Sequence, residues 1–180
     1  MIDERYPIGT FTPPTGPASP AERNDRIEQI AAAPANFRRA VAGLDDAQLD
    51  TPYRDGGWTV RQVAHHLPDS HMNAYLRFKW GLTEENPAIK TYEEKDWAKT
   101  PETRAPIAMS LDLLTSLHQR WVTLLRAMRP GDFARTIQHP EWGKPSLDTM
   151  LALYAWHGRH HTAHVTMLRK RRGWGGGNSD

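Results

Sequence analysis

Four stretches of the chain repeat their apolar residues with the 3.6-residue period of an α-helix, and this repetition limits the fold more than any other feature. The stretches cover residues 19 to about 43, 60–82, about 108–128 and 147–172. No stretch alternates apolar and polar residues for long enough to predict a sheet strand. The pattern therefore predicts an all-α protein, a four-helix bundle with a long connection after the second helix, residues 83–106, and shorter connections elsewhere.

Residues typical of helix N-termini mark where three of these helices begin. Ser19 with Glu22 and Thr59 with Gln62 have the spacing of a capping box, in which two side chains bond the first free N–H groups of a helix. Ser146 stands directly before the fourth helix and is a favourable cap.

Two prolines fall inside the helical patterns. Because proline removes one backbone hydrogen bond, we expect the first helix to bend near Pro34 and the second to be kinked or interrupted at Pro68.

The third helix is predicted to bury the stripe Met109, Leu113, Leu117, Trp121, Leu124 and Leu125. The fourth is predicted to bury Leu147, Met150, Leu151, Tyr154, His157, His161, Val165 and Leu168.

The length of 180 residues predicts one domain. We expect an extended, proline-containing N-terminal arm over 1–18, a single helical domain over 19–172, and a flexible glycine-rich tail over 173–180.

The N-terminus has no signal-peptide core and no apolar run is long enough for a membrane span, so we expect a cytoplasmic protein without a membrane partner. We interpret the basic run 169–172 as the solvated end of a helix. Because basic residues are not clustered elsewhere, we expect no nucleic-acid partner.

The chain contains no cysteine, so disulfides, thiolate metal sites and a cysteine nucleophile are excluded. Any metal must be held by nitrogen and oxygen ligands. Seven of the nine histidines fall into two short windows, 65–71 and 157–164. Histidine at such density in helices patterned for burial indicates a chemical role, because packing alone would favour leucine.

In the fourth helix the histidines form two pairs with a spacing of four residues, and residues four apart share one helix face. His157 and His161 continue the apolar stripe, whereas His160 and His164 lie on a face rotated by about 100 degrees. The pattern therefore favours His157 and His161 as the pair that faces inward.

In the second helix His65 and His66 are both candidates for a third ligand, and periodicity favours His66 only slightly. Three imidazoles from two helices would leave an open coordination position, as in a catalytic zinc site. We expect His71 to be a hydrogen-bonded core or pocket histidine, and His118 and His139 to be surface histidines.

Several segments carry a family resemblance over nearly the full length. They are YPIG at 6–9, LDTPYRDGGWTVRQVAHHLPDSHMNAYLRFK at 49–79, LHQRW at 117–121 and LYAWHGRHHTAH at 153–164. With these segments the chain resembles the YfiT-like proteins of the DinB superfamily, which also includes bacillithiol S-transferases. Two positions depart from the pattern: Pro68 stands where alanine is expected, and Arg159 where a histidine is more usual.

The resemblance implies a four-helix bundle, a homodimer, and one divalent metal per subunit, zinc or nickel. It implies that the ligands are His66, His157 and His161, which separates His66 from His65.

A divalent ion on three neutral imidazoles lowers the pKa of a bound water or thiol, so two reactions fit such a site. The resemblance implies a metal-dependent hydrolase acting on a small molecule. The alternative is a thiol S-transferase, for which Arg77 and Arg159 could hold a small acidic thiol. A third hypothesis is a non-enzymatic metal-binding stress-response protein. Candidates for substrate positioning or proton transfer are His71, Asn73 and Arg77.

Overall fold

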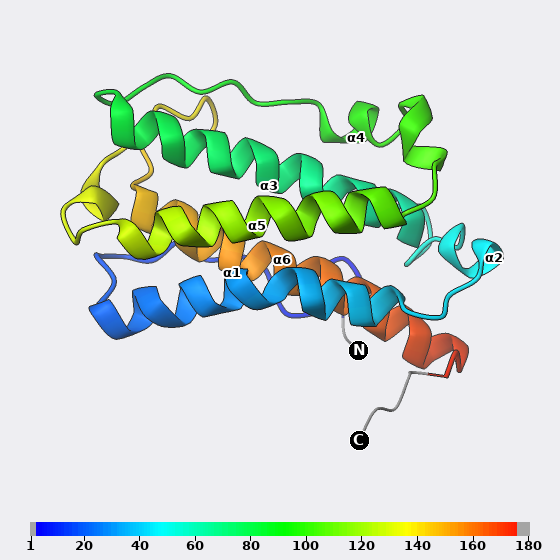
Figure 1. The fold of residues 1–180 in the computed structure, drawn as a ribbon. Helices are drawn as coiled ribbons and strands as arrows, with labels where there is room; N and C mark the ends of the chain where they lie inside the picture. The colour runs from blue at the N-terminus through cyan, green and yellow to red at the C-terminus, as the bar shows by residue number, and fades with distance from the viewer. Residues whose placement is uncertain (1–2, 176–180) are drawn as a thin grey trace.

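A computed structural model describes residues 3–175, and four long helices dominate it (Figure 1). They are α1 (Pro20–Val41), α3 (Val60–Thr83), α5 (Ala108–Ala127) and α6 (Leu147–Arg172). The connections contain α2 (Asp46–Leu49), α4 (Glu94–Trp97) and the 3₁₀ turns η1 (Pro101–Arg104) and η2 (Asp132–Ala134). Between residues 3 and 175, extended segments pair only as isolated bridges, so the prediction of an all-α fold is confirmed.

The four long helices form a bundle in which each packs against two others, in the ring order α1, α5, α3, α6. After α3 the chain runs back along that helix through α4 and η1 before it enters α5 (Figure 1). This connection is the longest of the three, as predicted. None of the helices in the described part of the chain has the length and apolarity of a membrane span.

The predicted caps fix where the helices begin. Ser19 with Glu22 and Thr59 with Gln62 each make both hydrogen bonds of a capping box. The Ser146 hydroxyl accepts the backbone N–H of the third residue of α6. These local bonds hold α3 and α6, which carry seven of the nine histidines, in their register.

Both internal prolines lie within unbroken helices. The predicted interruption of α3 at Pro68 is wrong, because the helix continues through this residue, whose ring is buried in the bundle. In α1, Pro34 is also buried, and it has no N–H with which to bond the carbonyl of Ile30 four residues earlier.

The apolar core is divided into two clusters. One contains Ile30, Phe78, Trp121, Met150 and their neighbours, and the other contains Phe37, Leu67, Leu114, Leu168 and their neighbours. Between the two clusters each of three helices carries histidine: buried His71 on α3, buried His118 on α5, and buried His161 and half-buried His157 on α6. A layer of imidazoles therefore crosses the middle of the bundle.

The predicted inward stripe of α5 is partly wrong. Met109 and Leu113 are 60% and 45% exposed, whereas His118, expected at the surface, is 2% exposed. The buried row is Ser110, Leu111, Leu114, His118, Trp121, Val122 and Leu125. His118 interrupts the apolar pattern of this buried row. The neighbouring row, which contains only apolar side chains, therefore had the more continuous pattern in the sequence.

The N-terminal arm has no helix from residue 3 to 18 and is fastened to α6. The carbonyl of Arg5 accepts a hydrogen bond from Nε2 of His164 (3.2 Å), and Asp148 accepts the backbone N–H of Ala18 (2.8 Å). The rings of Phe11 and Trp142 stack with centroids 6.0 Å apart. Most of the predicted flexible tail, residues 176–180, lies outside the described residues.

Candidate metal centre

Three histidines from two helices converge at one point of the imidazole layer. His66, His157 and His161 each bring a ring nitrogen to within 4.8 Å of the other two. The Nε2 atoms of His66 and His157 are 3.4 Å apart. The spacing of four residues places two of these rings side by side on α6, and the capped α3 presents the third.

The electrostatics of the three rings suit a cation. Burial lowers the pKa of His66 to about 4 and lowers the pKa of His157 and His161 well below its usual value. The rings are therefore neutral at pH 7, which is the form in which histidine binds a metal. Nitrogen lone pairs brought this close repel each other unless a proton or a cation lies between them, so the arrangement fits a divalent ion.

His65 faces another part of the protein. Its two ring nitrogens contact the hydroxyl of Ser110 (2.7 Å) and the carbonyl of Ala105 (3.0 Å). The structure thus brings His66, rather than its neighbour, to the pair on α6.

Both histidines of the second pair of α6, His160 and His164, are buried, which the sequence pattern did not predict. His164 stacks on Tyr53 with ring centroids 3.9 Å apart, and His160 lies against Trp156 and Tyr6. The loop before α3 and the N-terminal arm supply this cover. His160, His161 and His164 also have ring nitrogens within 4.8 Å of one another, so His161 belongs to two possible three-histidine groups.

A cavity of about 720 Å³ opens beside the histidines. Trp58 and Trp156 form aromatic parts of its wall, and the three metal-ligand candidates lie in its lining. Its charged lining residues are Arg54, Glu94, Lys95 and Lys99. The cavity would give a small molecule access to the point where the three rings meet.

A second cavity of about 410 Å³ shares His157, Glu94 and Lys95 with the first. Arg77 lines it, is buried, and donates a hydrogen bond to the Tyr154 hydroxyl (3.1 Å). The two cavities therefore meet at His157, with a guanidinium in the wall of the smaller one.

The three residues predicted to position substrate or transfer protons have different environments. Arg77 lines a cavity, as described. His71 is fully buried behind His157, so it can act on a bound molecule only through that ring. The amide nitrogen of Asn73 donates to the carbonyl of Asp69 within the same helix (2.9 Å), a local structural use. Arg159, considered for binding a thiol, is exposed and bonds its own helix at Ala155.

Sequence reasoning missed two polar residues near the site. His118 contacts His71, and only a correct inward stripe for α5 could have revealed it. Glu94 of α4 is exposed at the entrance of both cavities, and partial desolvation of its carboxyl group raises the pKa of that group. A carboxyl of this kind beside histidines is suited to proton transfer, but one glutamate within an acidic loop gives no distinct signal in the sequence.

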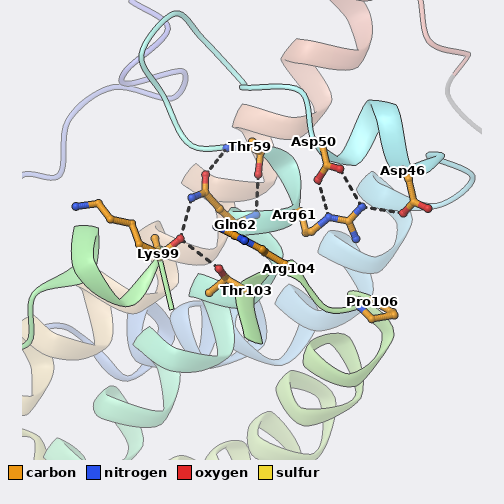
Figure 2. Close-up of a pocket in the computed structure, with 10 residues that line it drawn as sticks. Asp46, Asp50, Thr59, Arg61, Gln62, Lys99, Thr103, Arg104 and Pro106 are labelled. Carbon is orange, nitrogen blue, oxygen red and sulfur yellow. Dashed lines mark hydrogen bonds and ion pairs between the residues drawn. The ribbon is translucent and has the colours of Figure 1, made fainter. Parts of the chain in front are cut away.

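A cavity of comparable size, about 740 Å³, lies near the start of α3 (Figure 2). In it Arg61 binds Asp50 (2.6 Å) and Asp46 (2.7 Å), and the Gln62 amide donates to the carbonyl of Ala98 (2.8 Å). Figure 2 shows Arg61 directed at Asp50 and Asp46, and Gln62 directed at a backbone carbonyl, so their polar groups attach α2 and the long connection to α3. The histidine cavity is therefore the better candidate for chemistry.

Comparison with known proteins identifies the family of the chain. The DinB superfamily profile matches residues 29–165. Proteins from Bacillus mycoides (strain KBAB4) and Bacillus cereus (strain B4264), each named "Putative metal-dependent hydrolase", are 52% identical over 174 residues, covering 97% of this chain and 100% of the relative.

Solved structures show the same fold. YfiT from Bacillus subtilis, described as "a probable metal-dependent hydrolase with an unusual four-helix bundle topology", superposes with a TM-score of 0.92 at 47% identity, covering 96% of this chain and 99% of that one. TT2238, described as a four-helix bundle protein, superposes with a TM-score of 0.54 at 19% identity over 84% of this chain and 98% of its own, which supports the fold alone. The chain belongs to the DinB superfamily.

Proposed function

We propose that this protein is a metal-dependent hydrolase whose single divalent ion, zinc or nickel, is held by His66, His157 and His161. The convergence of three neutral imidazole nitrogens at the wall of a cavity carries the proposal. The names of the relatives support it. A cytoplasmic location and a homodimer stay predictions.

The chemistry divides between the ion and the surrounding side chains. A divalent ion with three histidine ligands and an open position supplies Lewis-acid activation of water or of a substrate oxygen. Trp58 and Trp156 provide apolar surface against which a small substrate can pack and exclude water. Glu94, with its raised pKa, is placed to hold or move a proton, and Arg77 can orient an oxygen atom from the second cavity.

A second candidate function is thiol S-transfer. The histidine cavity is lined by three cations, Arg54, Lys95 and Lys99, against the single carboxylate of Glu94. This excess of positive charge favours a small acidic thiol, and the same ion would favour its deprotonated form. Turnover that requires an added low-molecular-weight thiol would distinguish this function from hydrolysis.

The proposal is tested by measuring turnover on a panel of small esters, amides and phosphate esters, with and without added thiol. We expect wild-type protein to turn over at least one compound and His157→Ala to lose that activity. His65→Gln is the matched control, because His65 is a buried histidine of α3 whose ring contacts Ser110 and Ala105 instead of the site. Equal activity in wild type and His157→Ala, with metal bound only to the wild type, would refute the proposal, because the bound metal would then take no part in the reaction.

A further inference from the structure

A row of three imidazoles leads from the proposed metal centre through the bundle to α1. Nδ1 of His157 is 3.0 Å from Nε2 of His71, and Nδ1 of His71 is 2.7 Å from Nε2 of His118. Nδ1 of His118 is 2.7 Å from the backbone carbonyl oxygen of Ile30. The row thus joins α6, α3, α5 and α1 through hydrogen bonds.

The last acceptor in the row is available because of a proline. In an α-helix the Ile30 carbonyl would accept the N–H of the residue four positions later, but that residue is Pro34, which has no N–H. The carbonyl therefore has the capacity to accept the bond from His118. Pro34 therefore removes one backbone hydrogen bond from α1 and leaves the Ile30 carbonyl as a fixed acceptor for the row.

The direction of every hydrogen bond follows from this acceptor. A carbonyl cannot donate, so Nδ1 of His118 carries the proton and, in a neutral ring, Nε2 of His118 accepts. The proton between the next two rings then belongs to Nδ1 of His71, and the proton of the last bond belongs to Nδ1 of His157. This order leaves Nε2 of His157 without a proton, and this atom is the one that lies 3.4 Å from Nε2 of His66.

Burial keeps the rings neutral, as this order requires. His71 is fully buried and His118 is 2% exposed. Burial lowers the pKa of His118 to about 4. The rings of Trp121 and Tyr154 both meet that of His71 edge to face, with centroids 5.8 and 5.6 Å away, and these contacts limit the rotation of the ring.

We propose that the Ile30 carbonyl, acting through His118 and His71, fixes the tautomer of His157 and directs its Nε2 lone pair toward the metal. His71 and His118 are then positioning residues, and His71 contacts no substrate. The inference rests on the proposed metal centre, because it assigns how one ligand of that centre is oriented. Outer residues that orient a metal ligand typically change metal affinity about 10–100-fold when they are removed.

The first test reads the protons directly. In metal-free protein with ¹⁵N-labelled histidine, long-range ¹H–¹⁵N NMR correlations distinguish a protonated Nδ1 from a protonated Nε2. We expect His71, His118 and His157 all to carry the proton on Nδ1 at neutral pH. A proton on Nε2 of His157 or of His71 would overturn the proposal.

The second test measures affinity for zinc ion by competition with a chelator. His118→Phe keeps an aromatic ring but removes the donor and the acceptor, so we expect zinc binding about 10–100-fold weaker than wild type. His118→Gln can donate its amide N–H to Ile30 and accept from His71 with its amide oxygen, so it should bind zinc within about threefold of wild type. His65→Gln, outside the row, should also bind like wild type.

Equal zinc affinity in wild type and His118→Phe would overturn the proposal, as would equal losses in His118→Phe and His118→Gln. If His118→Phe does not fold, the NMR assignment in wild type and the affinity of His118→Gln still decide the question. A wild type that binds no zinc but shows the predicted tautomers would refute the proposed function while leaving the hydrogen-bond order intact.

Discussion

Replacing His118 by glutamine should make the protein less sensitive to acid. His118 is 2% exposed, and burial in the layer between the two apolar clusters lowers its pKa from 6.5 to about 4, although the Ile30 carbonyl acts in the opposite direction. The unfolded chain binds a proton at this histidine below about pH 6.5, whereas the folded protein resists it until about pH 4. The unfolded state therefore binds more protons in this window, and the free energy of unfolding falls as the pH falls.

The size of the effect follows from the two pKa values. Between about pH 7.5 and about pH 5.5, a histidine whose pKa is about 6.5 unfolded and about 4 folded lowers the free energy of unfolding by roughly 1.3 kcal/mol. His118→Gln lacks this titration. The free energy of unfolding of wild type should therefore decrease by about 1.3 kcal/mol more than that of the variant over the same pH interval.

Urea unfolding followed by circular dichroism, with a chelator present so that metal binding does not contribute, measures both free energies at the two pH values. The other buried histidines titrate in both proteins, so the difference between the two changes isolates His118. The reasoning is refuted if wild type and His118→Gln lose the same free energy within about 0.3 kcal/mol, since His118 would then not be held neutral by burial.

Two further predictions concern packing around α6. Asp148 is buried, binds Arg23 (2.9 Å) and accepts a backbone N–H of the arm, so Asp148→Ala should lower the free energy of unfolding by about 3 kcal/mol in urea. Asp112→Ala, which removes an exposed ion pair, should change it by less than about 0.5 kcal/mol, and equal effects of the two would contradict this account. A Cβ atom at Gly158 would lie 3.0 Å from the Cβ of Ala33, so Gly158→Val should force α1 and α6 apart and lower the free energy of unfolding by roughly 1–3 kcal/mol. Unchanged stability of Gly158→Val in the same assay would show that the two helices are not closely packed there.

The four long helices, their boundaries and three of their caps could be predicted because they depend on local sequence, whereas the short helices α2 and α4 were not predicted. Ser19, Thr59 and Ser146 bond N–H groups within three residues, so their spacing is enough to locate three helix starts. The tertiary environment of α5 could not be predicted in this way. Its buried row includes His118, and a polar residue is recognised as buried only when its partners from other helices, here His71 and Ile30, are known.

The candidate site was predictable to a similar extent. The spacing of His157 and His161 within one helix indicated a pair of ligands, and helical geometry brings them together. The burial of His160 and His164 depends on cover from the N-terminal arm and from Tyr53, far away in the sequence, so periodicity could not reveal it.

The three-histidine metal site is tested most directly by the metal content of untagged protein purified without chelators, measured by inductively coupled plasma mass spectrometry. Wild type, the double variant His66→Ala, His157→Ala and the control His65→Gln should be compared after equilibration with zinc or nickel and removal of free ion. We expect about one ion per chain in wild type and in the control, and none in the double variant. A wild type that stays without metal after equilibration with both ions would contradict this expectation.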